Sequence, residues 1–239
     1  MTTLLIATRN VHKVEEIRAV LGAAFHCLTL ADFPLAPAVI EDANTFAGNA
    51  TKKAAELAAW CVSTVRHLQS AIGDSSPDFV LADDSGLEVD VLQGAPGVHS
   101  ARFAALDASA GSNSSDEANN AKLLQWLAQA PMERRTARFR CVIALTPIPV
   151  RGHTPIVPTV AELVAQTRLF EGACEGCVGF APQGKGGFGY DPLFIPRTYT
   201  ETFAELGESI KNRISHRAAA LSRLQEYLAV PCAGYGRDA

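Results

Sequence analysis

Two adjacent carboxylates, Asp83 and Asp84, are the side chains of this sequence best placed to do chemistry. They directly follow the apolar run Phe79-Val80-Leu81-Ala82, which is typical of a buried strand that carries acids at its end. Successive strand residues point to opposite faces, so we expect one carboxylate to face a cleft and the other to meet backbone or solvent. The Ser85-Gly86 pair that follows predicts a tight turn or hairpin. Alone, the pair is also compatible with an acidic surface turn.

A second candidate site lies near the start of the chain. Leu4-Leu5-Ile6-Ala7 predicts a buried strand, and apolar residues at helical spacing from Val11 to Leu21 predict a helix. Asn10 is suited to cap that helix and Gly22 to end it. Such a joint gathers backbone N–H groups, the positive end of the helix dipole and the ammonium of Lys13, which suits a phosphate. A lysine in a first helical turn is also often simply solvated.

Two further acids, Glu41 and Asp42, lie just before a long alanine-rich helix that is predicted to run from Thr45 toward Gln69. Acids at this end of a helix stabilise it through the dipole, by a few tenths to about 1 kcal/mol, and need no further function.

A glycine-rich stretch and a group of cations complete the candidates. Gly184 to Gly189 contains G-x-G-x-x-G, but Pro192 follows closely, so we expect a loop that presents Phe188 and not a dinucleotide-binding helix. The last helix is predicted to begin near Ser215, with His216-Arg217 in its first turn and Lys211 just before it. Cations at a helix N-terminus oppose the dipole, and we expect an anion to compensate them.

Length and composition limit the class of protein. A chain of 239 residues with 48% hydrophobic residues can bury a large core, and we expect a single domain over residues 1–239 with two lobes. Residues 146–167 are rich in proline and are predicted to be an insertion without a core. The net charge of −4 argues against a surface for nucleic acid. No apolar run reaches roughly 18 residues and no charged leader opens the chain, so we expect no membrane partner and a cytoplasmic location.

Six scattered cysteines are too sparse for a disulfide scaffold, and Cys174-Glu175-Gly176-Cys177 lacks the second ligand pair that a zinc site needs. We expect reduced thiols and an ordinary role for this pair.

Five blocks, in this order along the chain, resemble the inosine triphosphate pyrophosphatase (Ham1-like) family, whose members hydrolyse noncanonical purine nucleoside triphosphates. The blocks are Thr8 to Glu16, Glu41 to Ala54, Ala82 to Arg102, Gly186 to Pro192 and Ser215 to Arg217. The resemblance extends over residues 3 to 228. It implies an α/β fold with a long curved mixed β-sheet, flanking helices and two lobes around a central cleft, and a homodimer.

The resemblance also implies an activity and roles for residues. The activity is hydrolysis of ITP, dITP and XTP to the monophosphate and pyrophosphate, with Mg²⁺ as cofactor. Asp84 would be the catalytic base, and Glu41 and Asp84 the metal ligands. The implied substrate contacts are Thr8, Arg9, Asn10, Val11, His12, Lys13, Ser85, Phe188, Gly189, Tyr190, Asp191, Lys211, His216 and Arg217.

The chemistry of these residues agrees with the implied roles. Mg²⁺ prefers one or two carboxylates together with phosphate oxygens. Phe188 offers a stacking face, and His216 and Arg217 offer donors to a 6-keto oxygen.

Two alternatives remain at this point. Maf-like pyrophosphatases, which act on modified pyrimidine or methylated guanine nucleotides, also open with a strand-helix joint, but the Ser215-His216-Arg217 block and the loop around Phe188 speak against them. A noncatalytic nucleotide-binding protein on the same fold would be expected to lack one of the carboxylates Glu41 and Asp84, and both are present.

Overall fold

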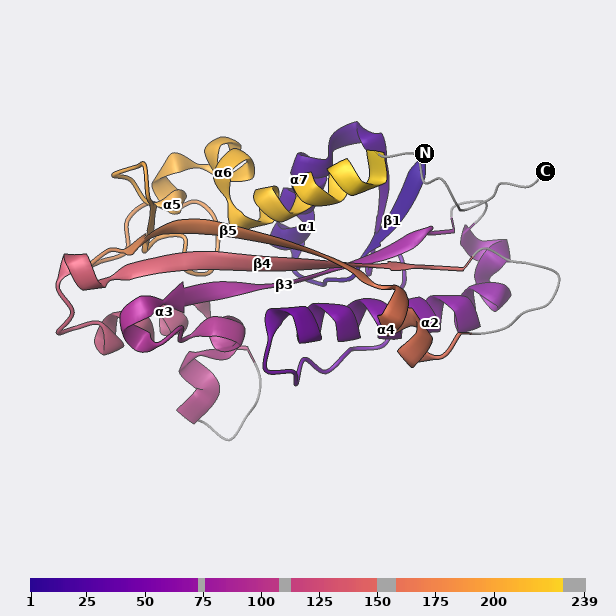
Figure 1. The fold of residues 1–239 in the computed structure, drawn as a ribbon, viewed down its shortest axis with the longest axis horizontal. Coiled ribbons are helices and arrows are strands. Elements are labelled where there is room, and N and C mark those ends of the chain that lie inside the picture. The colour runs from indigo at the N-terminus through magenta and orange to yellow at the C-terminus, as the bar shows by residue number, and fades with distance from the viewer. Residues whose placement is uncertain (73–75, 108–112, 150–157, 230–239) are drawn as a thin grey trace.

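The computed structural model describes residues 1–72, 76–107, 113–149 and 158–229, and its framework is one six-stranded mixed sheet (Figure 1). The strand order is β2-β1-β3-β4-β5-β6, with β1 parallel to β2 and β3 and the remaining neighbours antiparallel. The strands are β1 (Thr2–Ile6), β2 (Phe25–Thr29), β3 (Phe79–Val89), β4 (Thr136–Pro147), β5 (Arg168–Val178) and β6 (Phe194–Pro196). The expected α/β fold with a long mixed sheet is confirmed.

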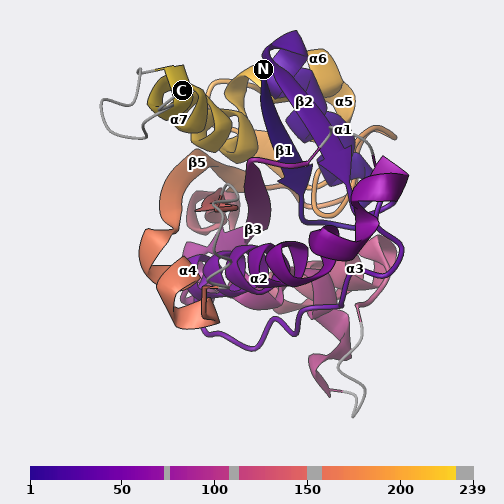
Figure 2. The same cartoon turned by 90° about the vertical axis from the view of Figure 1, so that its right-hand side faces the viewer.

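Helices cover both faces of the sheet. They are α1 (Val11–Leu21), α2 (Phe46–Ile72), α3 (Asp116–Trp126), α4 (Val160–Gln166), α5 (Phe203–Leu206), α6 (Glu208–Ile214) and α7 (His216–Ala229). Helices α1, α5, α6 and α7 lie on one side of the long strands, and α2, α3 and α4 on the other (Figures 1 and 2). In the described part of the chain, no helix is both long and apolar enough to cross a membrane.

Three apolar clusters show why the molecule has two lobes. At the β1 end of the sheet, α2 packs on one face through residues such as Ala54 and Leu57, and α1 and α7 pack on the other through Ile17 and Leu221. At the far end of the long strands, a separate cluster that includes Phe139 joins β4 to the regions around α3 and β6. Because β3 and β4 contribute to clusters at both ends, the lobes share one sheet.

The turn predicted at Ser85-Gly86 is wrong, since β3 continues through both residues. Ser85 pairs with Cys141 of β4, and Gly86 pairs with Arg140. A Cβ atom on Gly86 would lie 2.4 Å from the Ser100 hydroxyl oxygen. Glycine is therefore needed at this position because the segment Gly97–Arg102 packs closely against the strand. It does not mark a reversal of the chain.

The predicted insertion at 146–167 is also partly wrong. Thr146 is fully buried at the end of β4, and α4 supplies the fully buried Leu163 to the cluster around α2. Thr159 and Glu162 form a capping box at the start of α4, so this helix is specified locally. The part of the prediction that concerns residues 150–157 lies outside the described residues.

The packing of α7 on β5 leads to a first prediction. A Cβ atom at Gly172 would lie 2.0 Å from the carbonyl oxygen of His216 and 2.5 Å from the amide nitrogen of Ala220. Gly172→Ala must therefore push the first turn of α7 away from the sheet, and we expect it to lower the free energy of unfolding by about 1–3 kcal/mol, as overpacking does. Urea unfolding followed by circular dichroism measures this.

Gly179→Ala is the matched control, because the nearest atom to its Cβ would lie 3.5 Å away, an ordinary contact. Its free energy of unfolding should stay within about 0.5 kcal/mol of the wild type. Equal unfolding midpoints for the two variants would contradict the close packing of α7.

Candidate active site

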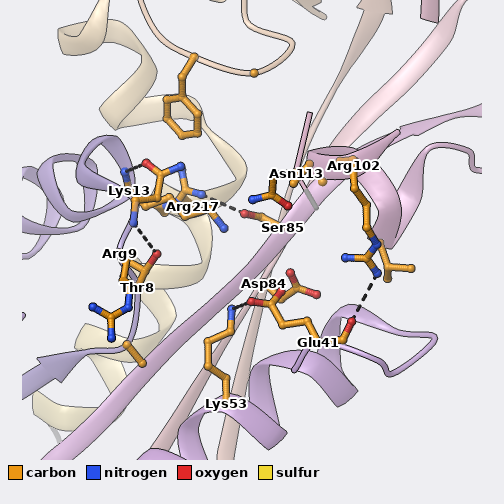
Figure 3. A pocket seen from close by; sticks show the side chains of 18 of the residues that line it. Thr8, Arg9, Lys13, Glu41, Lys53, Asp84, Ser85, Arg102, Asn113 and Arg217 are labelled. Carbon is orange, nitrogen blue, oxygen red and sulfur yellow. Dashed lines mark hydrogen bonds and ion pairs between the residues drawn. The ribbon is translucent and has the colours of Figure 1, made fainter. Parts of the chain in front are cut away.

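A cavity of about 840 Å³ lies where the two lobes meet, and it collects most of the residues singled out from the sequence (Figure 3). The predicted site residues that line it are Thr8, Arg9, Asn10, Lys13, Glu41, Asp84, Ser85, Phe188, Gly189, Tyr190, Asp191, Lys211, His216 and Arg217. They come from the joint between β1 and α1, the loop before α2, β3, the loop before β6, α6 and α7. Two predicted substrate contacts, Val11 and His12, are not among the lining residues: Val11 is 64% exposed, and His12 stacks on Phe188.

The joint between β1 and α1 has the predicted form. Asn10 caps α1, because its side-chain oxygen accepts a hydrogen bond from the backbone N–H of Lys13 at 3.1 Å. The Thr8 hydroxyl in turn accepts the backbone N–H of Asn10 at 3.1 Å. Local side chains thus already satisfy two of the backbone donors that were expected to be free for phosphate. The ammonium of Lys13 remains on the cavity wall, where it pairs with Asp83.

Asp83 occupies a different environment from the one expected. It meets neither backbone nor solvent, because its buried carboxylate lies between Lys13 and Arg217 and also accepts hydrogen bonds from Ser85 (2.9 Å) and Cys141 (3.1 Å). Burial alone would raise the pKa of Asp83, but the charges of Arg217 and Lys13 outweigh it and hold the pKa well below its ordinary value. Asp83 is therefore ionised, and it fixes two cations of the cavity wall.

Asp84 lies on the opposite face of β3 and lines the cavity. It is 6% exposed, and the side-chain amide of Asn49 in α2 donates a hydrogen bond to it at 3.1 Å. Burial raises the pKa of Asp84 to about 6, with a contribution from the charge of Glu41, against the opposing charges of Lys13 and Lys53. A carboxyl group with this pKa is poised to exchange a proton near neutral pH.

Glu41 and Asp84 approach each other at the α2 side of the cavity (Figure 3). The ammonium of Lys53 lies 2.8 Å from a Glu41 carboxylate oxygen and donates to the backbone carbonyl of Asp83 at 2.9 Å. Hard carboxylate oxygens are the ligands that Mg²⁺ prefers. The negative charge of Glu41 disfavours ionisation of Asp84, and a cation bound between the two carboxylates would remove this repulsion. The residues present therefore fit a divalent cation.

The partner of the cations at the start of α7 is not the one that the sequence analysis led us to expect. The expected compensating anion is supplied by the protein itself, because Arg217 pairs with both Glu16 of α1 and Asp83. Lys211 pairs with Glu16 at 2.7 Å and with Asp191. Arg217 also donates to the Ser85 hydroxyl at 2.9 Å. Its side chain still lines the cavity, so its predicted contact with a base stays a prediction.

His216 is held as a neutral imidazole. Burial lowers its pKa well below the ordinary value, and the neighbouring charges of Arg217 and Lys211 add to this. Its ring stacks on Phe139 with centroids 4.7 Å apart. One ring nitrogen, Nδ1, is buried and has no hydrogen-bond partner among the described residues.

Several residues of this site received no role from the sequence. Asn49 and Lys53 are one helical turn apart in α2, and both are buried polar residues within an alanine-rich face. Polar side chains at that spacing on an apolar face are a signal that sequence inspection could have used. Glu16 and Arg102 stand at the ends of two blocks of the family resemblance but received no role there, and Asn113 carried no signal. Glu16 pairs with two cations, and Arg102 and Asn113 line the cavity.

Fold and site together define an α/β protein with a cleft in which cations lie beside two carboxylates suited to a divalent metal. The Ham1 family model matches residues 4–227, and the chain belongs to this family. The chain is 44% identical to the dITP/XTP pyrophosphatase of Desulforamulus reducens over 226 residues, which cover 94% of each chain. It is also 44% identical to the dITP/XTP pyrophosphatase of Geobacter sulfurreducens, over 95% of this chain and 97% of that one.

Solved structures agree with the family. The Staphylococcus aureus Ham1 protein superimposes with a TM-score of 0.70 at 32% identity, covering 95% of this chain and 98% of that one. The resemblance found in the sequence is therefore confirmed.

The role of Asp83 leads to a stability prediction. Asp83→Asn removes the charge that compensates two cations, the half-buried Lys13 and the buried Arg217, and we expect it to lower the free energy of unfolding by about 3–5 kcal/mol. Urea unfolding measures the change. Glu171→Gln is the matched control, because Glu171 forms an exposed ion pair with Arg140 at 3.0 Å, and its loss should cost no more than about 1 kcal/mol. A mild effect of Asp83→Asn would show that this carboxylate does not organise the cations.

The raised pKa of Asp84 leads to a prediction for the metal-free protein. Because the folded-state pKa, about 6, exceeds the ordinary 3.8, the stabilising contribution of the neutral carboxyl is complete below about pH 4. It is lost as the pH rises through 6. Asp84→Asn carries a neutral group at every pH, so its advantage in unfolding free energy over the wild type should grow by roughly 2–3 kcal/mol from pH 4 to pH 8. Urea titrations in EDTA measure this difference, and a difference independent of pH would refute the buried position of Asp84.

Proposed function

We propose that this protein is a nucleoside triphosphate pyrophosphohydrolase that acts on noncanonical purine nucleotides (ITP, dITP and XTP) and releases the monophosphate and pyrophosphate. The observation that carries the proposal is the meeting of Asp84 and Glu41 with Lys13 and Lys53 in one cavity. Two curated relatives at 44% identity, each named dITP/XTP pyrophosphatase, support the substrate class. Removing such nucleotides would keep the nucleotide pool clean.

The cavity wall offers groups suited to both parts of the substrate. The joint between β1 and α1 supplies Thr8, Asn10 and Lys13 for phosphate oxygens, and Phe188 with His216 and Arg217 supplies a face and donors for a purine. Ser85 and Asp84 of β3 also line this cavity. We propose that the phosphorus atom nearest the nucleoside lies beside Asp84, so that cleavage falls between the α and β phosphates.

Asp84 has the properties of a general base in this reaction. Its carboxylate is held by Asn49, and a cation bound beside it would keep it ionised, so that it can accept a proton from an attacking water. Mg²⁺ held by Glu41 and Asp84 would screen the negative charge on the phosphates and make that water more acidic. Lys13 and Lys53 would compensate the charge that develops on the leaving pyrophosphate.

Selection of the base follows from hydrogen-bond donors. A guanidinium has donors only, so Arg217 can pair with a 6-keto oxygen but not with the 6-amino group of adenine. A site built on hydrogen bonds can reject a mismatched partner by factors of about 10⁴ or more. Three nitrogens of Arg217 already bond to protein groups, and these bonds fix the direction of the remaining N–H groups.

The wider biology belongs to the same proposal. We propose a homodimer in the cytoplasm that takes a small nucleotide as its partner and binds neither nucleic acid nor membrane. The Ham1 family match argues against the Maf-like alternative. The noncatalytic alternative is decided by assay.

The test is one assay of ITP, dITP, XTP and ATP with Mg²⁺, in which chromatography and a pyrophosphate-specific enzyme identify the products. We expect pyrophosphate and the monophosphate from the first three substrates, little turnover of ATP, and no turnover without a divalent cation. Asp84→Asn should reduce kcat by at least about 10³-fold, because the amide neither accepts a proton nor neutralises a cation. Stepwise release of inorganic phosphate would exclude the proposed reaction.

A further inference from the structure

The ring of Phe188 stands between two hollows. One is the large cavity, and the other is a smaller hollow of about 160 Å³ that is lined by α1, Gly187 and α6. The imidazole of His12 lines only the smaller one and stacks on Phe188, with ring centroids 5.4 Å apart and planes 15° apart. His12 thus supports the ring from outside the cavity.

The backbone around Phe188 does not fix the ring by itself. Gly187 and Gly189 on either side have φ values of 72° and 63°, a region that glycine enters freely. The fixed points are contacts: the backbone N–H of Phe188 donates to Asp191 at 2.9 Å, and the Lys211 ammonium lies 4.4 Å from the ring centroid. Lys211 lines the large cavity, whereas His12 does not. In the described structure, His12 is the aromatic side chain stacked on Phe188.

We infer that His12 is a positioning residue, which holds Phe188 in the orientation that stacks on the purine and does not itself contact the substrate. The inference rests on the proposed function and deepens it, because it assigns how the base is gripped. His12 precedes Lys13 in the first turn of α1, so the helix that supplies a proposed phosphate ligand also supports the ring that stacks on the base. This role differs from the direct substrate contact implied for His12 by the family resemblance.

Three variants at one position separate stacking from polar contact. His12→Phe keeps the flat ring, His12→Gln keeps a hydrogen-bonding group without a ring, and His12→Ala removes both. We expect the glutamine and alanine variants to raise KM for ITP by about two- to tenfold, the range that corresponds to the worth of an aromatic pair, with little change in kcat. His12→Phe should restore KM to near the wild-type value. The control is His26→Ala, a change to an exposed histidine on β2, which should leave both constants unchanged.

Inorganic tripolyphosphate serves as a ligand without a base. Its inhibition constant against ITP should be the same for all three His12 variants, because stacking does not concern the phosphates. If the inhibition constant rises, or if glutamine preserves KM and phenylalanine does not, His12 contacts the substrate directly and the inference is wrong. A wild-type KM in His12→Ala would equally overturn it.

Failure of the proposed function would be recognised separately. If the wild-type protein did not hydrolyse ITP, that function would fail, and the stack would be judged by a double-mutant cycle of His12→Ala and Phe188→Ala in urea unfolding. Nonadditive changes would support the contact between the rings. Additive changes would overturn it.

Discussion

A continuous series of ion pairs, buried except at the partly exposed Lys13, organises this molecule. Negative and positive groups alternate along it in the order Asp191, Lys211, Glu16, Arg217, Asp83 and Lys13. Three carboxylates compensate three cations, and the members come from the loop before β6, α6, α1, α7 and β3. Buried ion pairs contribute little net stability compared with apolar packing, but leaving one member unpaired is costly. The series therefore specifies how five separate segments fit together.

The same series explains why the cavity wall is arranged before any ligand arrives. Lys13, Lys211 and Arg217 carry long side chains that would lose much rotational freedom if a ligand had to order them. Their carboxylate partners order them during folding. A ligand that meets these cations then loses less entropy on binding, which is the advantage of a preorganised site. Asp84 stands apart from the series, on the other face of β3, where its charge is not compensated in the same way.

The sequence predicted the local features of this structure well and the long-range ones poorly. The helix from Val11 to Leu21 with its Asn10 cap, the long helix after Thr45 and the helix that begins at His216 are encoded by spacing and caps, and all three are present. The prediction of a turn at Ser85-Gly86 was wrong, because the pairing of β3 with β4 outweighs the local preference of these residues for a turn.

Most of the candidate site residues also meet in one cavity, but their partners could not be read from the chain. Asp83 and Arg217 are 134 positions apart, and Glu16 and Arg217 are 201 apart. No local pattern encodes such contacts. The family resemblance supplied the set of residues, and only the fold shows which of them hold each other and which are directed toward a ligand.

The long strands set a mechanical limit on this cleft. Because β3 and β4 run without interruption from one lobe to the other, the two halves are joined by a hydrogen-bonded ribbon and not by a linker. Hinges usually need a few residues that absorb large changes in φ and ψ. The residues of a paired strand cannot make such changes without breaking their hydrogen bonds to the neighbouring strand. Any closure of the lobes must therefore spread as a small change of twist along the whole sheet, which makes the cleft stiff and leaves the larger adjustments to the loops at its rim.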